Sequence, residues 1–197
     1  MKASLLFPVL LLLVCGVFTF PNPVAGQDPA HEVTPQQPAS VIFVRHAETA
    51  ADTKSTRDPE LSEAGMDRAI ALASLLEHAG VTHLFASEYQ RTQSTIKVLA
   101  ERTGVEVVVV PAGQMHRQMS DLNKLPAGSV AVVCGHSNTV PAMVFGMEGE
   151  ISDLVGKTVQ KQVLEHGTYD RLFLVTLPAN AGAKVKTMEL RYGDSGS

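Results

Sequence analysis

The sequence predicts an α/β fold, a three-layer sandwich in which helices cover both faces of a mostly parallel central sheet. From Ser40 onward, short runs rich in β-branched residues alternate with stretches whose apolar residues recur at helical spacing. The strand-like runs are apolar at almost every position, which is typical of parallel strands buried on both faces. The chain has 197 residues, a length that suits one domain.

The expected elements alternate in type along most of the chain. In order, they are a strand over 40–46, a helix over 61–80, a strand over 82–87, a helix over 90–104, a strand over 105–111, a helix over 114–125, a strand over 129–136, and helices over 138–146 and 150–164. Ser62 is a candidate N-cap of the first helix, and Gly80 is its terminator. Two final strands, 168–178 and 183–193, are joined by a short Ala/Asn/Gly turn, so we expect an antiparallel pair.

The first 26 residues have the features of an export signal. Lys2 supplies a positive charge, residues 5–20 form an apolar core, and Val24-Ala25-Gly26 offers a cleavage site before Gln27. An uncleaved membrane anchor is the alternative, because the charge-free segment nearly reaches the length of a bilayer. Its prolines oppose one long spanning helix. We expect cleavage, export to the periplasm or the exterior, and no stable membrane span afterwards.

The rest of the chain divides into a linker, one domain and a short tail. Residues 27–39 hold three prolines among polar residues and are expected to be a flexible linker. The domain is expected over 40–193, and a disordered tail over 194–197. The oligomeric state is left open.

The charge of the chain limits its partners. A formal net charge of −4 gives no basic face for nucleic acid, so no nucleic-acid partner is expected. Any anion site must therefore be built locally from a few arginines. Cleavage of the export signal would leave Cys134 as the one remaining cysteine, in an apolar run where we expect a buried, inert thiol.

Polar side chains follow three of the expected strands. Arg45 and His46 end the first strand, Ser87 leads from the second strand to Arg91, and His136 ends the fourth. Because ligands bind beyond the carboxyl ends of parallel strands, we expect two histidines and two arginines at one edge of the sheet.

This set of side chains favours phosphoryl chemistry. Guanidinium groups match tetrahedral oxyanions, and a neutral imidazole is a competent nucleophile toward phosphorus. A second, protonated imidazole would stabilise the charge that develops during transfer. The sequence has no Cys/His spacing or carboxylate cluster typical of a metal site. We expect neither metal nor cofactor, with arginines in the place that magnesium takes in many phosphoryl-transfer enzymes.

Four segments, in order, resemble the histidine phosphatase superfamily, which has the phosphoglycerate mutase-like fold. VRHAET (44–49) resembles its L-R-H-G-E-T signature, and LSEAGMDRA (61–69) resembles L-[ST]-x-x-G-x-x-[QR]-A. SEYQRTQST (87–95) and VCGHSNTV (133–140) resemble two further motifs of the family. The similarity extends from about Val41 to Thr176, nearly all of the expected domain.

The resemblance implies a role for each matching residue. His46 would be the nucleophile and form a phosphohistidine that water hydrolyses. Arg45 and Arg91 would hold the phosphoryl oxygens, and His136 would complete the pocket. Thr49 would lie in the loop that contacts the phosphate. The implied activity is that of a metal-independent phosphatase acting on a small phosphorylated substrate or a phosphoprotein.

The sequence departs from the family pattern at the acid that protonates the leaving group. Many members carry a glutamate downstream of the second arginine, but residues 110–123 contain none. Another branch has an acid directly after the second histidine, where this chain has Ser137. The location of Glu88 or Glu48 would allow either to serve as the acid that protonates the leaving group, or no acid is used. Glu88 is also a candidate for substrate binding. Substrates with good leaving groups, such as phosphohistidine, acyl phosphates and aryl phosphates, would be least affected.

Two other functions fit parts of the sequence. An exported pseudophosphatase would bind phosphorylated ligands without turnover, as the absent acid allows. A serine esterase would use Ser137 in a G-x-S-x-G turn, but Thr139 stands at the second glycine position. His166 is also the one histidine downstream of that serine, which leaves little chain for a triad.

Overall fold

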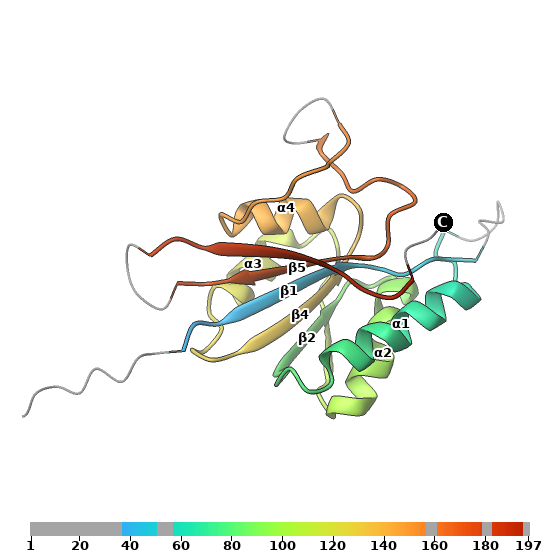
Figure 1. Ribbon diagram of the computed structural model, residues 1–197, viewed down its shortest axis with the longest axis horizontal. Coiled ribbons are helices and arrows are strands. Elements are labelled where there is room, and N and C mark those ends of the chain that lie inside the picture. Colours follow the sequence, from blue (N-terminus) through green and yellow to red (C-terminus); the bar gives the residue numbers. More distant parts are fainter. Residues whose placement is uncertain (1–36, 51–56, 157–160, 179–182, 195–197) are drawn as a thin grey trace, which may run out of the picture. The chain divides into compact units, whose positions relative to one another are not determined.

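The computed structural model describes residues 37–50, 57–156, 161–178 and 183–194, and these form a six-stranded mixed sheet with helices on both faces (Figure 1). The strands are β1 (Ser40–Arg45), β2 (His83–Ala86), β3 (Val107–Val109), β4 (Val130–Gly135), β5 (Arg171–Thr176) and β6 (Lys186–Arg191). The helices are α1 (Glu63–Leu76), α2 (Gln90–Thr103), α3 (Met115–Leu122) and α4 (Thr139–Gly146).

The strand order is β3-β2-β4-β1-β5-β6. β1 pairs with β4, β4 with β2, and β2 with β3, all in parallel. β5 runs antiparallel to β1, and β6 runs antiparallel to β5. The predicted α/β sandwich with a mostly parallel sheet and a final antiparallel pair is therefore confirmed.

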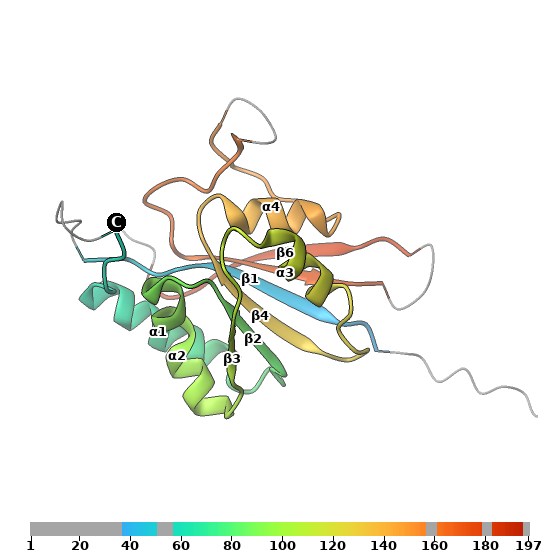
Figure 2. The same cartoon turned by 180° about the vertical axis from the view of Figure 1, so that it is seen from behind.

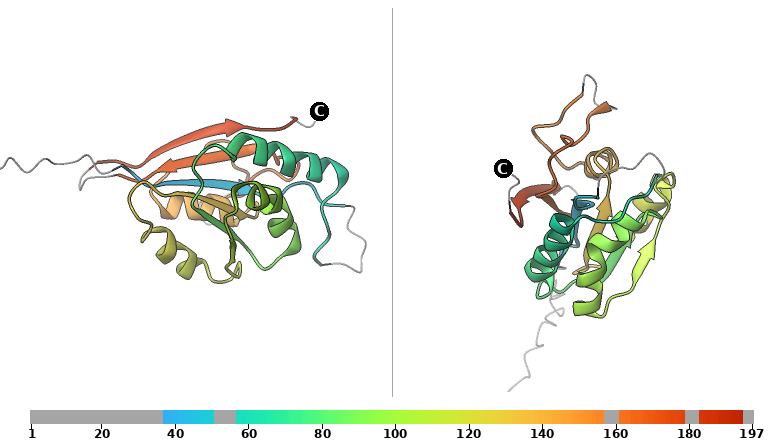
Figure 3. Two further views of the ribbon diagram at one scale, coloured as in Figure 1. Left: turned by 90° about the horizontal axis from the view of Figure 1, so that it is seen from below. Right: turned by 90° about the vertical axis from the view of Figure 1, so that its right-hand side faces the viewer.

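The two faces of the sheet bury separate apolar clusters, as the alternation along β1 requires. Ile42 and Val44 point toward α1 and α2, where they join Leu72 and Ile96. Val41 and Phe43 belong to the opposite cluster, under α3 and α4, together with Phe173. Phe43 and Phe173 are fully buried, and each contributes about 1.5–3 kcal/mol by leaving water. Figures 2 and 3 show the two helix pairs on opposite sides of the sheet.

The helix ends follow local sequence signals. The Ser62 hydroxyl accepts a hydrogen bond from the Gly65 N–H at 3.2 Å, so the predicted N-cap forms. α2 ends at Gly104, whose φ of +71° is the left-handed conformation that glycine favours. α1 ends at Leu76, before the predicted terminator Gly80, and a turn occupies the residues between them.

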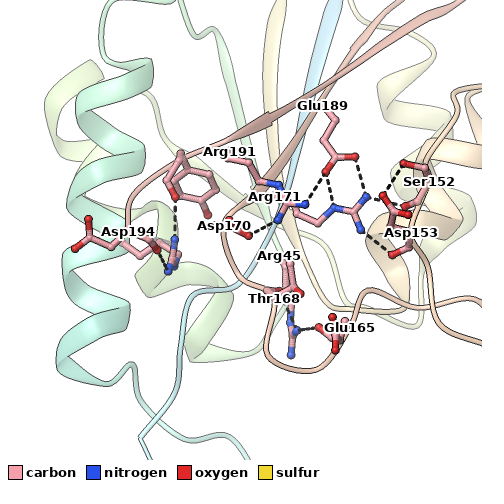
Figure 4. Close-up of polar contacts among 12 residues, drawn as sticks. Arg45, Ser152, Asp153, Glu165, Thr168, Asp170, Arg171, Glu189, Arg191 and Asp194 are labelled. Atoms are coloured by element: carbon pink, nitrogen blue, oxygen red, sulfur yellow. Dashed lines mark hydrogen bonds and ion pairs between the residues drawn. The ribbon is translucent and has the colours of Figure 1, made fainter. Parts of the chain in front are cut away.

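The helix predicted over 150–164 is wrong for the residues that are described. Asp153 has a φ of +53°, which interrupts a right-handed helix, and Val155 forms an isolated antiparallel bridge with Val163. The buried Arg171 side chain on β5 donates to the carbonyl oxygens of Ser152 and Asp153 (Figure 4). These bonds to a side chain replace the helical ones.

Several sequence predictions fall on the undescribed segments. The export signal over 1–26, most of the linker over 27–39, the turn between β5 and β6, and most of the tail over 194–197 lie outside the described residues. Within the described part of the linker, Gln37 and Ala39 accept backbone hydrogen bonds from Gly128 and Leu177. None of the described helices has the length and apolar character that crossing a membrane requires.

A close backbone approach fixes the chain that follows β1 against α1. The Glu48 carbonyl accepts a hydrogen bond from the Ser62 N–H at 2.9 Å, and Gly65 lies directly against the same carbonyl. A Cβ at Gly65 would overlap the Glu48 oxygen. The Glu48 carboxylate also pairs with Arg68 on α1 at 2.7 Å. The loop that leaves the sheet after His46 is therefore held by the first two turns of α1.

We predict that Gly65→Ala destabilises the protein although alanine is the better helix former. Helix propensity alone would stabilise the variant by about 1 kcal/mol. The clash with a backbone carbonyl opposes this and is expected to prevail, for a net loss of about 1–3 kcal/mol measured by urea unfolding. Gly113→Ala is the control, because nothing lies within 4 Å of its added Cβ. Equal effects of the two substitutions would contradict the close approach.

Candidate active site

The sheet brings four chain segments to one edge. β1, β2 and β4 are parallel neighbours, so the residues after their carboxyl ends meet there. β5 is antiparallel, and its amino end reaches the same edge. The predicted set of Arg45, His46, Arg91 and His136 is thereby brought together, with the His46 and His136 ring centroids 5.4 Å apart.

A cavity opens beside the two histidines. Its lining side chains come from the ends of β1 and β4, the start of α2 and the loop before α3: His46, Tyr89, Arg91, Ala112, Gly113, His136, Ser137, Asn138 and Thr139. Behind His136 lies a second, narrower and mostly apolar cavity beneath α3. None of the described residues that line the first cavity carries a carboxylate.

His46 is oriented and kept neutral by its surroundings. Its Nδ1 lies 2.9 Å from the Ala47 carbonyl oxygen. Because a carbonyl only accepts, Nδ1 carries the proton, and Nε2 keeps its lone pair. Burial, together with the nearby arginine charges, lowers the pKa of His46 to about 4. At neutral pH the side chain is therefore an unprotonated imidazole with a fixed tautomer.

The backbone beside His46 is tied to α2. The Ala47 N–H donates to the Thr95 hydroxyl at 2.9 Å, and that hydroxyl donates to the Arg91 carbonyl at 2.7 Å. Thr95 is completely buried. One side chain thus links Ala47, the residue after His46, to Arg91.

His136 lies between two side chains that fix its tautomer. Its Nδ1 lies 3.5 Å from the Arg91 Nη2, which can only donate, so its Nε2 carries the proton and donates to the Ser87 hydroxyl at 2.9 Å. Burial, and then the charge of Arg91, lowers the pKa of His136 to about 4. A phosphoryl dianion in the cavity would raise this pKa, so protonation of His136 would accompany substrate binding.

Arg45 is anchored through one end of its guanidinium. Nη1 donates to the carbonyl oxygens of Glu165, His166 and Thr168 at 3.0, 2.9 and 3.2 Å. Figure 4 shows Arg45 beside Glu165 and Thr168. The Tyr169 ring lies against the same group, 4.1 Å from Cζ. Burial lowers the pKa of Arg45, but an arginine remains charged. Its buried Nε–H has no hydrogen-bond partner among the described residues.

Arg91 is held from two directions. Its Nη1 donates to Asp58 Oδ1 at 3.0 Å, and its Cζ lies 4.3 Å from the centre of the Tyr89 ring. The remaining Nη2 faces His136 at the cavity. Both guanidinium groups are therefore fixed before an anion arrives.

The other predicted site residues lie elsewhere. Thr49 pairs with Leu61 in an isolated antiparallel bridge and is not among the lining residues. Glu88 is exposed, and its carboxylate accepts from the Ala112 N–H at 2.7 Å. It holds the loop at the rim of the cavity, and its charge raises the pKa of His136 against the larger effect of burial.

The contacts of Glu48 and Ser137 do not fit the roles considered for them, a general acid and an esterase nucleophile. The Glu48 carboxylate is bound to Arg68 by three hydrogen bonds of 2.7–2.9 Å. Burial opposes the charge, but these bonds keep the pKa of Glu48 below its ordinary value. Ser137 lines the cavity, but among the described residues no histidine or carboxylate is bonded to its hydroxyl. Its carbonyl accepts from Leu164.

Sequence reasoning missed several contributors. The Tyr169 ring and the carbonyl oxygens of Glu165, His166 and Thr168 contact Arg45. The predicted antiparallel pair contained the signal, because the start of an antiparallel strand lies where the parallel strands end. Asp58 and Tyr89 hold Arg91, and nothing in their local sequence marks them. Among the described residues, no three His, Cys, Asp or Glu side chains are grouped to hold a metal ion.

Comparisons with known proteins agree with this geometry. Residues 41–114 match the model of the histidine phosphatase superfamily, branch 1. A Yersinia pestis protein named "Probable phosphoglycerate mutase GpmB" is 35% identical over 75 residues, which are 36% of this chain and 35% of that protein. The chain therefore aligns with only about a third of that relative's length.

Solved structures share the fold. A mycobacterial glucosyl-3-phosphoglycerate phosphatase superposes with a TM-score of 0.53 at 16% identity, covering 71% of this chain and 91% of that one. The protein histidine phosphatase SixA, solved with tungstate, gives a TM-score of 0.54 at 17% identity, with 78% and 95% covered. At these identities the likeness concerns the fold.

A buried histidine at the end of the first strand lies beside two arginines on an α/β sandwich. The segment that carries this histidine and both arginines, residues 41–114, matches the model of the histidine phosphatase superfamily, and phosphatases of solved structure share the fold.

The two buried histidines predict a loss of stability in mild acid. In the unfolded chain a histidine titrates near its ordinary pKa of 6.5, whereas both folded values are about 4. As the pH falls from 6.5 to 4 the unfolded state takes up these protons first, so their contribution to stability is present above pH 6.5 and lost by pH 4. The loss is up to about 3 kcal/mol for each histidine.

Urea unfolding of the wild type and of a His46→Asn/His136→Gln variant, at several pH values from 7 to 4, measures this loss. The variant retains hydrogen-bonding groups but cannot titrate, so its stability is expected to fall less steeply over this range. Parallel curves for the two proteins would contradict the assignment of neutral, buried imidazoles.

Proposed function

We propose that the protein is a phosphatase that moves a phosphoryl group from its substrate to Nε2 of His46 and then to water. The observation that carries the proposal is the neutral, buried imidazole of His46. Its Nδ1 is tied to the Ala47 carbonyl, and two anchored guanidinium groups lie beside it. The match of residues 41–114 to the model of the histidine phosphatase superfamily supports this type of chemistry.

The first step forms a bond between Nε2 of His46 and phosphorus. The Nε2 lone pair attacks while the bond from phosphorus to the leaving oxygen or nitrogen breaks, and the leaving group takes that electron pair. The Nδ1–H stays bonded to the Ala47 carbonyl oxygen, which stabilises the positive ring of the phosphohistidine.

The second step returns the enzyme to its starting form. Water attacks phosphorus, and the P–N bond breaks with its electron pair returning to Nε2. Inorganic phosphate leaves with one proton of the water, and the other proton passes to solvent. Arg45 and Arg91 face the same phosphoryl oxygens in both steps, and their fixed charges need no rearrangement as charge develops.

His136 contributes in its protonated form. The charge of the entering dianion raises the pKa of His136, which takes up a proton at Nδ1. This N–H then donates a hydrogen bond to a phosphoryl oxygen. The Ser87 hydroxyl holds its other nitrogen throughout. Binding is therefore expected to be coupled to proton uptake.

The composition of the cavity wall favours substrates whose leaving group departs without help. None of the described lining residues supplies a carboxylic acid, and Glu48 is committed to Arg68. Phosphohistidine, acyl phosphates and aryl phosphates have such leaving groups, whether on a small molecule or on a phosphoprotein. In this proposal the predicted export signal gives the enzyme a site of action in the periplasm or outside the cell.

We predict that His46→Ala lowers kcat for p-nitrophenyl phosphate and for a phosphohistidine peptide by at least about 10³-fold, because the nucleophile is lost. EDTA is expected to leave the wild-type rate unchanged. His83→Ala is the matched control, since His83 lies at the opposite end of β2 from the site. Release of inorganic phosphate is the readout, which distinguishes hydrolysis from transfer to a second acceptor.

Three results would overturn the proposal. Activity that survives in His46→Ala would place the nucleophile elsewhere, and activity abolished by EDTA would make the reaction metal-dependent. Normal phosphate binding without turnover of either substrate would make the protein a binder of phosphorylated ligands, the pseudophosphatase alternative.

A further inference from the structure

We propose that Asp58 is a positioning residue that sets the orientation of Arg91 for the phosphoryl group. The inference rests on the proposed function. Asp58 lies outside the helix that carries Arg91, on the segment leading into α1, and it does not line the cavity. Its carboxylate nevertheless makes two separate contacts to the start of α2.

The first contact gives the two terminal nitrogens of the Arg91 guanidinium different partners. Nη1 is bound to Asp58 Oδ1 at 3.0 Å, and Nη2 is directed toward His136 at 3.5 Å. The Tyr89 ring against Cζ limits tilting of the guanidinium plane, while the Asp58 bond limits rotation within that plane. Together they keep Nη2 as the donor that faces the cavity.

The second contact holds the backbone one residue before Arg91. The residue at the N-cap of α2, Tyr89, makes no capping hydrogen bond through its side chain. Asp58 Oδ2 instead accepts from the Gln90 N–H at 2.8 Å, and the Gln90 side-chain amide donates to the Asp58 carbonyl oxygen. Asp58 thus caps α2 from another segment and places a negative charge at its amino end.

The exposure of the pair indicates that it serves geometry more than stability. The side chains of Arg91 and Asp58 are 16% and 34% exposed, and ion pairs with this access to water add little to the stability of a fold. Orientation has a larger effect, because a displacement of about 1 Å in a catalytic group can lower a rate by about 10²-fold. Loss of Asp58 should therefore affect turnover well beyond its effect on folding.

The sign of the effect on anion binding separates two roles for Asp58. If its charge acted only as a competitor for Arg91, removing it would strengthen phosphate binding. If it orients Arg91, removing it weakens phosphate binding, because Nη2 is no longer held toward the site. The positioning role predicts the weaker binding.

A double-mutant cycle tests this role. Asp58→Ala is expected to lower kcat/KM for p-nitrophenyl phosphate by about 10-fold or more, and to raise the Kd of inorganic phosphate measured by calorimetry several-fold. In an Arg91→Ala background the same substitution should change either quantity by less than about 2-fold, because the group that it positions is absent. Asp58→Asn retains one acceptor oxygen and should give an intermediate loss.

Glu77→Ala is the matched control. Glu77, which follows α1, pairs with Arg102 on α2 at 3.1 Å, and its side chain is about as exposed as that of Asp58. Arg102 lies in the last turn of α2, at the opposite end of that helix from Arg91. Glu77→Ala should leave kcat/KM and the phosphate Kd unchanged. Thermal unfolding of each variant, followed by circular dichroism, establishes that the compared proteins are folded.

The outcomes separate this inference from the proposed function. Equal losses in the wild-type and Arg91→Ala backgrounds, or phosphate binding unchanged or tighter in Asp58→Ala, would overturn the role of Asp58 while leaving His46 as the nucleophile. If no protein in the series turned over substrate, the phosphatase would be refuted. Coupling between Asp58 and Arg91 in the phosphate Kd would then still support the positioning role.

Discussion

The hydrogen bond from Nδ1 of His46 to the Ala47 carbonyl is the interaction on which the rest of the site depends, because it leaves the lone pair on Nε2, the atom that we propose as the nucleophile. The surrounding structure holds the loop that makes this bond. Thr95 ties Ala47 to α2, and the close approach of Gly65 to Glu48 fixes the next residue against α1. The three-layer fold thus positions one nitrogen atom through two helices packed on the same face of the sheet.

Local electrostatics complete the site in a chain whose formal net charge is −4. Arg45 and Arg91 are each anchored through Nη1, the first by backbone carbonyl oxygens and the second by a carboxylate. Their charges, with burial, keep the two histidines neutral when no anion is bound. In the proposed reaction a phosphoryl dianion would reverse this balance, because its charge would raise the pKa of His136 and favour the protonated form.

The sequence predicted the elements that are periodic and buried, because apolar strands and capped helices carry local signals. Arg45, His46 and His136 could be placed because each lies at the end of a buried strand, and Arg91 because it lies in the first turn of the helix after the second strand. The helix over 150–164 failed where Arg171, distant in sequence, takes the carbonyl oxygens of Ser152 and Asp153. Asp58 and Tyr169 were missed for the same reason, since their partners are set by tertiary contacts rather than by neighbours in the chain.

If the phosphoryl group is bound to His46 during turnover, as we propose, the covalent intermediate can be trapped. The enzyme would be mixed with excess substrate, quenched in alkali during turnover, digested and analysed by tandem mass spectrometry. We expect a phosphoryl group on the peptide that contains His46, and this group should be stable in alkali and lost in acid. A phosphoryl group on Ser137 or His136 instead, or turnover with no phosphorylated enzyme, would contradict this proposal.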